Sequence, residues 1–253
     1  MLQELLALNI FGFFLIFARV GTALALMPGF SAAYVPVDMR LVLALAISFA
    51  MAPALIDSLP VRPPTTAGLA ILIVGEMLIG AFMGTLATII MGALQTAGTI
   101  IAYVASMANA LIQDPIAEQQ SSTIASFLLV LGVTLVFVSD LHHLMLRAVA
   151  DSYTLMAPGQ PMPAGDLAET MGRHVADSFS LGLRLSAPFV IVGLTYYIGL
   201  GLLGRLMPQL QVFFFGLPFQ IGAQIWVLAI TVTGIMMAFM QRFSDAFNGF
   251  ILP

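Results

Sequence analysis

The chain has 253 residues, of which 60% are hydrophobic and 8% are charged, and its formal net charge is −4. A soluble domain averages roughly 25% charged residues, so much of this surface must face lipid or equally apolar protein, and the length suits one domain or one bundle. The small, scattered charge argues against nucleic-acid binding, and the absence of Cys excludes disulfides, thiolate catalysis and Cys-ligated metals.

Long apolar segments predict helices in the first part of the chain. The segment 5–27 is long enough to span a bilayer core of about 30 Å. The segment 41–56 reaches only about 24 Å at a rise of 1.5 Å per residue, which is short for a span. The stretch 67–105 is too long for one span, so we expect a helical hairpin or a bent pair of helices, with bends at Gly92 and Gly98.

The middle of the chain alternates between polar and apolar stretches. A polar stretch at 106–122 is followed by a short apolar run at 123–138. The longest polar region, 139–178, contains a loop rich in Pro and Gly at 157–165, and we expect amphipathic helix on both sides of it. Polar backbone at membrane depth is tolerated only where protein buries it or where it lines a watery cavity. The stretch 106–122 is therefore either such a segment or an ordinary turn outside the membrane.

Two more apolar segments, 181–203 and 212–240, follow, and we expect Gly216 and Pro218 to break the second one early. The eight Arg residues are spread over nearly every break, so the positive-inside rule gives no orientation. Short spans, one overlong stretch and scattered Arg share one explanation, which is that the helices pack against similar subunits. The predicted fold class is an all-α membrane protein of apolar helices and helical hairpins.

Two ionisable residues lie inside apolar segments. A central Arg such as Arg19 costs about 2.5–3.5 kcal/mol on insertion scales. It is either a contact for a substrate or ion, or a structural residue that snorkels or pairs with an acid such as Glu76. Glu76 is followed by Gly80 and Gly84, whose spacing lets another backbone approach closely. Helix packing is the default interpretation of this region, and a proton relay is the alternative.

Sequence patterns that mark metal-binding, nucleotide-binding or catalytic sites in other proteins lack the neighbouring residues that such sites need. His142 and His143 are adjacent, so on a helix they point about 100° apart, and His174 is distant in the sequence. We therefore expect these residues to be polar groups at helix ends and not the ligands of a metal ion. The Gly-x-Gly-x-x-Gly letters at 199–204 lie in an apolar segment and follow no strand. Because no nucleophile stands beside a base, we expect no enzyme and no cofactor.

The stretch 207–221, Met-Pro-Gln-Leu-Gln-Val-Phe-Phe-Phe-Gly-Leu-Pro-Phe-Gln-Ile, closely resembles a motif of the FliR family. FliR is a subunit of the flagellar type III secretion export gate, with an SctT-like counterpart in virulence-type injectisomes. Further matches run along nearly the whole chain in the same order. They are Arg19-Val20-Gly21, Pro28, Val35-Pro36, Arg40, Gly75-Glu76, Gly80, Gly84, Asp114-Pro115, and His142-His143 through Ser152 and Pro158. Ser106 and Leu141 depart from the pattern, because each stands where the family often has Gly.

The resemblance implies a non-enzymatic channel subunit in the bacterial inner membrane, at the flagellar basal body. Residues 1–178 resemble FliP and residues 179–253 resemble FliQ. The implied partners are several FliP-like and FliQ-like subunits, FlhB-like and FlhA-like export proteins, membrane lipid and unfolded flagellar protein substrates, but no nucleic acid. The implied assembly residues are Arg19, Glu76, Gly80, Gly84, Pro208, Gln209, Phe213, Gly216 and Pro218.

The resemblance also implies that a loop plugs the resting pore, and here it falls on 106–122. The assigned residues are Ser106, Met107, Asn109, Gln113, Asp114, Pro115, Glu118, Gln119 and Gln120. A pore wide enough for an unfolded chain would dissipate ion gradients if open, and a polar loop can block it with weak, reversible contacts. Flexible Met side chains such as Met107 can seal around varied cargo.

Two alternatives stay open. One is the equivalent subunit of a virulence-type injectisome. The other, from a different class, is a small-molecule secondary transporter, which would have inverted repeats and a cluster of polar groups at mid-membrane. The only trace of such a cluster is the pair Gln220 and Gln224 at i, i+4 spacing.

Overall fold

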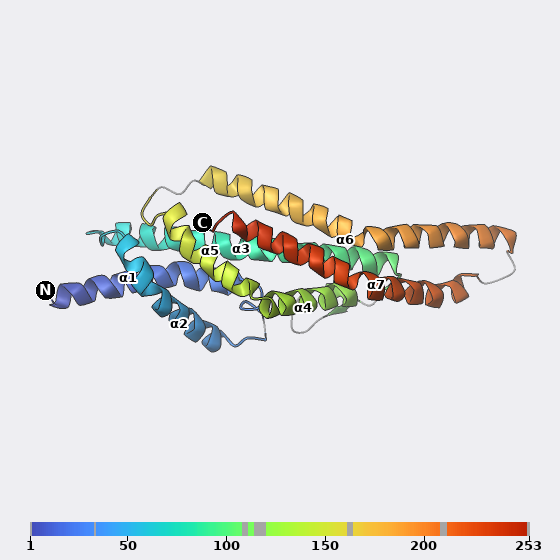
Figure 1. Ribbon diagram of the computed structural model, residues 1–253, viewed down its shortest axis with the longest axis horizontal. Helices are drawn as coiled ribbons and strands as arrows, with labels where there is room; N and C mark the ends of the chain where they lie inside the picture. Colours follow the sequence, from blue (N-terminus) through green and yellow to red (C-terminus); the bar gives the residue numbers. More distant parts are fainter. Residues whose placement is uncertain are drawn as a thin grey trace. The chain divides into compact units, whose positions relative to one another are not determined.

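The computed structural model describes residues 2–32, 34–107, 111–113, 120–160, 164–207 and 212–251. Within them the chain forms seven α-helices, one 3₁₀ turn and one short antiparallel pair of strands (Figure 1). In order these are α1 Leu2–Leu26, α2 Val37–Leu55, η1 Ile56–Ser58, α3 Thr66–Val104, β1 Leu111–Gln113, β2 Gln120–Ser122, α4 Thr123–Val138, α5 Leu141–Leu155, α6 Ala164–Leu206 and α7 Val212–Asn248. The predicted all-α membrane fold class is confirmed, and the strand pair is an addition to it.

The chain divides into two compact units. Unit 1 comprises Met1–Ile89, Val136–His174 and Phe243–Pro253, and unit 2 comprises Ile90–Leu135 and Val175–Arg242. The core of unit 1 includes Leu15, Ile16 and Val20 of α1 with Met83 and Leu86 of α3 and Met145 and Val149 of α5. The core of unit 2 includes Leu94, Ala97 and Ile101 of α3, Ala125 and Leu128 of α4, Phe189 of α6 and Phe239 of α7.

Among the residues that the structure describes, four helices are long and apolar enough to cross a membrane. They are Val37–Leu55, Thr66–Val104, Ala164–Leu206 and Gly216–Asn248. The helices α4 and α5 meet at a bend of 73° and together pass the same test, which gives a fifth candidate. The prediction of a protein with several apolar helices is therefore confirmed.

The stretch 67–105 does not fold as a hairpin, because α3 runs through it as one uninterrupted helix of 39 residues. Gly98 lies within this helix and faces α4, where a Cβ atom on it would lie 2.3 Å from the Ala125 Cα. Its lack of a side chain lets two backbones approach. The hairpin prediction was wrong, because α3 continues through this glycine, which permits a close contact between helices.

The predicted early break in the last segment was also wrong. The helix α7 begins at Val212 and continues through Gly216 and Pro218. A proline removes one backbone donor and crowds the preceding turn, and membrane helices tolerate it where neighbours satisfy the freed groups. The carbonyl that Pro218 leaves without its helical N–H donor is that of Phe214, four residues earlier. Close to it, the hydroxyl of Tyr196 in α6 donates a hydrogen bond to the Gly216 carbonyl at 2.5 Å and so joins this part of α7 to α6.

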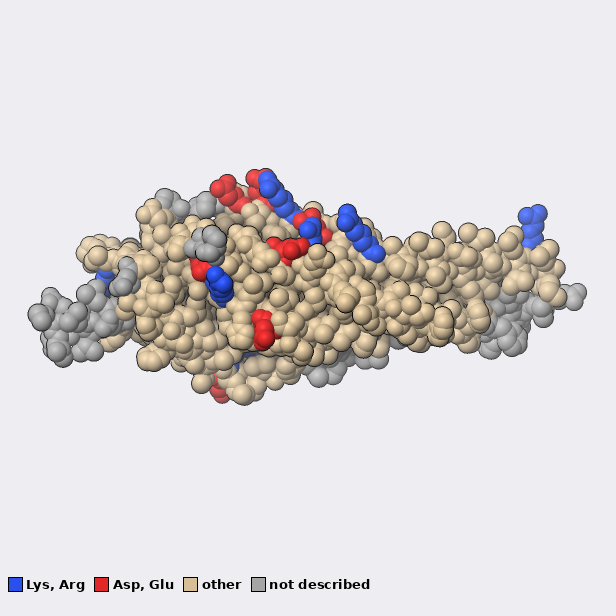
Figure 2. Space-filling model, viewed as in Figure 1, with Lys and Arg blue, Asp and Glu red and all other residues tan. Residues whose placement is uncertain are grey.

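The helices on both sides of the 157–165 loop are present, as predicted. In α5 the buried residues recur at helical spacing, at Met145, Ala148, Val149, Ser152 and Tyr153, so this helix is amphipathic. Figure 2 shows charged side chains gathered over the N-terminal part of α6, on a surface that otherwise carries few charges.

Much apolar surface is left exposed. The helix α2 buries only Ala44, Ser48 and Leu55 of its 19 residues. Phe49 of α2 is 74% exposed and Trp226 of α7 is 71% exposed. Such large apolar side chains need lipid or other protein around them.

Candidate functional site

Arg19 of α1 and Glu76 of α3 form a buried ion pair in unit 1. Their exposed fractions are 0% and 1%. The Arg19 Nε donates to Glu76 Oε2 at 2.7 Å, and Nη2 donates to Oε1 at 3.0 Å, so the pairing is bidentate. This geometry makes the strongest kind of hydrogen bond between charged groups. Glu76 is thus the partner of Arg19, as the sequence analysis had considered.

The end of α5 completes the shell around Arg19. Its Nη1 donates to Ser152 Oγ at 3.1 Å, and Nη2 also donates to the Met156 carbonyl at 2.9 Å. The guanidinium carbon lies 3.9 Å from the ring centroid of Tyr153, at cation–π distance. Most N–H donors of this guanidinium are therefore in use. The arrangement suits a fixed joint between three helices better than a contact for a passing substrate.

Gly80 and Gly84 explain how α1 and α3 come close enough for the ion pair. A Cβ atom on Gly80 would lie 2.1 Å from the Arg19 carbonyl oxygen, and one on Gly84 would lie 2.6 Å from the Ala23 carbonyl oxygen. Both distances are impossible for a real side chain. The two glycines thus face α1 one helical turn apart and bring the two backbones into contact.

The helix α3 ends immediately before the segment assigned as the plug. Met107 N–H donates to the Ala102 carbonyl at 2.9 Å and Ser106 N–H donates to the Tyr103 carbonyl at 3.2 Å. This is the Schellman pattern, in which one residue takes the left-handed conformation. Ser106 holds that position with φ +58°. It is the position where the FliR resemblance leads us to expect Gly.

Side chains of α6 and α7 in unit 2 hold the end of α3. Ser106 Oγ lies 3.1 Å from the Tyr197 hydroxyl. Gln220 Nε2 donates to that hydroxyl at 2.9 Å and to the Val104 carbonyl at 2.6 Å. Tyr197 was missed from the sequence, because a tyrosine in an apolar helix carries no signal of its partner.

The two ends of the predicted plug segment pair as strands. Gln113 of β1 stands opposite Gln120 of β2, within an antiparallel register that also joins Leu111 to Ser122. The strands were missed, although an Asp-Pro dipeptide between two short runs is a turn signal. The assigned residues Asn109, Asp114, Pro115, Glu118 and Gln119 lie outside the described residues, as do the assembly residues Pro208 and Gln209.

The remaining assembly residues lie near the start of α7. Phe213 belongs to the first turn of the helix, and its side chain is outside the described part of the structure. Gly216 is buried and Pro218 is exposed. Farther along, Gln220 and Gln224 are 1% and 2% exposed, and Gln224 Nε2 donates to the Phe189 carbonyl at 3.2 Å. These amides join α7 to α3 and α6.

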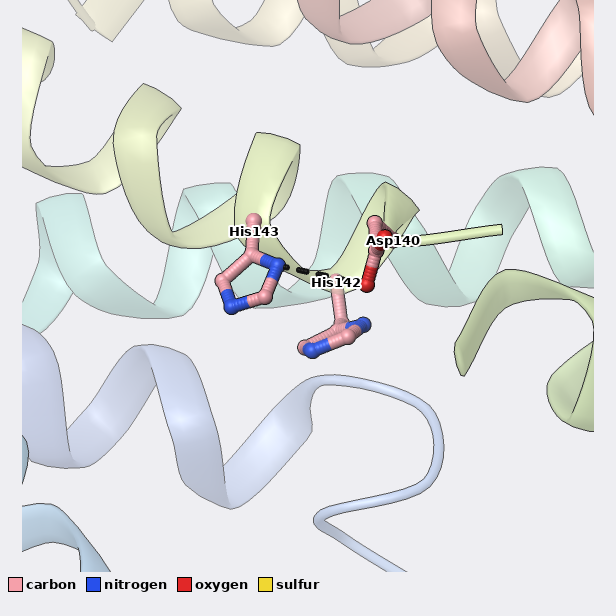
Figure 3. A group of neighbouring side chains, drawn as sticks. All are labelled: Asp140, His142 and His143. Carbon is pink, nitrogen blue, oxygen red and sulfur yellow. Dashed lines mark ion pairs between the residues drawn. The ribbon is translucent and has the colours of Figure 1, made fainter. Parts of the chain in front are cut away.

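His142 and His143 come together, against the expectation from their adjacency. Their ring centroids are 4.1 Å apart, and the His143 Nδ1 lies 3.6 Å from Asp140 Oδ1 (Figure 3). The pair occupies the first turn of α5, just after Asp140 with φ +60°. The 100° between successive residues of a helix describes the directions of the Cα–Cβ bonds. Rotation about the χ angles can still bring the rings of neighbouring residues together.

The profile of the family described as "Bacterial export proteins, family 1" matches residues 10–246. The chain belongs to this family. It is 36% identical over 236 residues to the flagellar biosynthetic protein FliR of Caulobacter vibrioides, covering 93% of this chain and 94% of that protein. It is 30% identical over 233 residues to FliR of Escherichia coli, covering 91% and 87%. With FliR of Bacillus subtilis it shares 27% identity over 241 residues, covering 92% and 90%.

These matches confirm the resemblance to FliR. The family match extends from the N-terminal half of α1 almost to the end of α7, so it includes both units and every polar contact described above. The chain is therefore a bacterial export protein of the FliR family with several apolar helices. Family membership also favours a structural export component over an enzyme.

Proposed function

We propose that this chain is a non-enzymatic channel subunit of the flagellar type III protein export gate in the bacterial inner membrane. The observation that carries the proposal is the match to FliR proteins over more than nine-tenths of the chain. The relatives reported above are flagellar by name, which favours a flagellar gate over an injectisome. Unfolded flagellar proteins would be the cargo.

The exposed apolar surface supports a role inside an assembly. The helix α3 has a contour length of about 58 Å at 1.5 Å per residue, close to twice the 30 Å hydrocarbon core of a bilayer. Lipid alone cannot cover such a helix, and α2 buries few of its own side chains. FliP-like and FliQ-like subunits would cover these faces, with residues 1–178 acting as the FliP-like part and 179–253 as the FliQ-like part. FlhB-like and FlhA-like proteins would complete the machinery.

The buried contacts suit the assembly role of the residues that the family resemblance singles out. Arg19 and Glu76, with Gly80 and Gly84, hold α1 and α3 together, and a rigid pair presents one fixed surface to a neighbouring subunit. At the start of α7, the Tyr196 contact to the Gly216 carbonyl does the same for the Pro218 turn. We assign Pro208, Gln209 and Phe213 to the same role.

The anchored ends of the segment 106–122 support a plug between them. Ser106 contacts Tyr197 at one end. At the other end Ser122 is 3% exposed, its Oγ donates to the Gly98 carbonyl at 3.3 Å, and the Ala125 N–H donates to that Oγ at 3.1 Å. Both ends are thus fixed to helices of unit 2. A change of conformation between them requires only local rearrangement.

Deleting residues 108–120 tests the plug. Ser106, Met107 and the Ser122 contacts remain, so the variant should still assemble with FliP-like and FliQ-like subunits, while cells that express it leak small ions. Full-length chain carrying Glu169→Gln, a change at an exposed site on α6, is the matched control and should leave permeability unchanged. Normal permeability in the deletion variant, with assembly intact, would rule out the plug.

The export role has a separate test. Removing the gene should abolish secretion of flagellin and motility, and supplying the chain in trans should restore both. The chain should also co-purify with FliP-like and FliQ-like subunits. A purified monomer that moves a small solute in liposomes without partners would favour the transporter alternative.

A further inference from the structure

We propose that Asp140, His142 and His143 form a binding site for a divalent transition-metal ion, with Zn²⁺ as the reference ion. Each residue offers one ligand atom, and the three atoms lie within 4.8 Å of one another. The site is at the junction of α4 and α5, within unit 1 (Figure 3). It is independent of the export role proposed above.

The backbone turn between α4 and α5 brings the three residues together. Asp140 precedes α5 with φ +60°, a left-handed conformation that Asp and Asn tolerate. A residue in this position commonly uses its side chain to cap the helix that follows. Asp140 makes no such capping bond, so its carboxylate remains available beside the two imidazoles.

His142 provides the observation that points to a ligand. Its ring stacks on Phe137, with centroids 5.0 Å apart and an interplanar angle of 15°, which fixes the plane of the imidazole. Its Nδ1 is buried and has no hydrogen-bond partner in the described part of the structure. A buried ring nitrogen without a partner is unfavourable, and coordination of a metal ion would satisfy it.

The donor set selects the class of ion. Two imidazole nitrogens and one carboxylate oxygen suit Zn²⁺, Ni²⁺ or Co²⁺, whereas Mg²⁺ and Ca²⁺ prefer oxygen ligands. Tetrahedral Zn²⁺ with bonds of about 2.0–2.1 Å needs ligand atoms about 3.3 Å apart. The Asp140 and His143 side chains are 78% and 70% exposed, so both can rotate inward to close this distance. Water would occupy the fourth position, as in other sites with three protein ligands.

Calorimetry with Zn²⁺ tests the site directly. The full-length chain, purified in detergent without a polyhistidine tag, should bind about one ion. The absence of Cys removes thiolate ligands from the background, and His174, the third histidine, provides a matched control. The changes Asp140→Asn and His142→Gln should each weaken binding at least about tenfold, whereas His174→Gln should leave it unchanged.

Asp140→Asn and His143→Gln also guard against a folding artefact. Both side chains are exposed, and Asn tolerates the left-handed backbone, so these variants should keep the parent's helical circular dichroism while losing affinity for Zn²⁺. Co²⁺ should give the visible absorption of a nitrogen- and oxygen-ligated ion, and Mg²⁺ should not displace it. Three results would overturn the site: no Zn²⁺ binding by the parent chain, full binding by the Asp140→Asn/His142→Gln double variant, or displacement by Mg²⁺.

Discussion

Replacing Glu76 with Gln tests whether the buried ion pair holds α1 and α3 together. The change removes one charge and keeps the shape of the side chain. Arg19, at 0% exposure, would then face an amide where two charge-assisted hydrogen bonds of 2.7 and 3.0 Å now exist. The amide can offer one acceptor oxygen to the guanidinium, and its N–H₂ group would meet a second donor.

The magnitude of the effect follows from what Arg19 keeps. Removing one partner of a buried ion pair costs about 3–5 kcal/mol, because the other charge is left uncompensated. Here the guanidinium retains Ser152 Oγ, the Met156 carbonyl and the face of Tyr153. We therefore expect a loss at the lower end, about 3 kcal/mol, in the free energy of unfolding. This is a large share of the roughly 5–15 kcal/mol that stabilises a typical protein.

The assay is reversible unfolding of the detergent-solubilised chain by increasing denaturant, followed by helical circular dichroism. Glu169→Gln is the matched control, because Glu169 pairs with Arg173 on the surface of α6 and their side chains are 63% and 75% exposed. That change should cost at most about 0.5 kcal/mol. Glu76→Gln within about 0.5 kcal/mol of the parent chain would refute the reasoning.

A double variant separates loss of the pair from burial of an unpaired charge. Arg19→Met combined with Glu76→Leu removes both charges, and such replacements are often neutral or stabilising. We expect the double variant to be more stable than the Glu76→Gln variant. Effects of Arg19→Met and Glu76→Leu that simply add would show no coupling between the two residues.

Two further predictions concern Gly80 and Ser106, and thermal unfolding measures both. Gly80→Ala should destabilise the protein by about 1–3 kcal/mol, because its Cβ would lie 2.1 Å from the Arg19 carbonyl oxygen. Gly75→Ala is the control on the same helix, because it has open space around it and should stabilise the protein by up to about 1 kcal/mol. Equal effects at the two sites would contradict the close contact at Gly80. Ser106→Ala keeps the left-handed strain and loses the Tyr197 contact, which should cost about 0.5–1.5 kcal/mol. Ser106→Gly loses the same contact but relieves about 1–2 kcal/mol of backbone strain, so it should be more stable than Ser106→Ala. The reverse order would refute the claim that the left-handed backbone at Ser106 is strained.

The sequence predicted element boundaries well where composition changes abruptly. The apolar run predicted at 123–138 coincides with α4. The loop predicted at 157–165 begins after the end of α5 at Leu155 and runs two residues into α6, which starts at Ala164. Polar and Pro- and Gly-rich neighbours mark these boundaries locally. Information within a few residues was enough to find them.

The errors arose where a local signal has two physical meanings. Gly98 can bend a helix or admit a neighbour, and the choice depends on Ala125, which is 27 residues away in the sequence. Pro218 can end a helix or be accommodated within it, and here α7 continues through it. For Gly98, the deciding partner lies outside any window that a periodicity argument uses.

The polar site was partly foreseeable. Arg19 and Glu76 stand out because ionisable residues are rare in apolar segments, so pairing them was a reasonable hypothesis. The Met156 carbonyl that completes the shell has no sequence signature, because every residue carries one. Ser152 stood among the matches to the FliR family, but nothing in the sequence linked its hydroxyl to Arg19.

The ribosome makes Arg19 long before it makes the groups that neutralise its charge. Glu76 follows 57 residues later and Ser152 follows 133 residues later. At about 5–20 residues per second, the first helix waits about 3–11 s for its carboxylate and about 7–27 s for the hydroxyl. Throughout that wait the bare guanidinium opposes entry into lipid by about 2.5–3.5 kcal/mol. The order of synthesis therefore leaves the charge of Arg19 unpaired until α3 has been made.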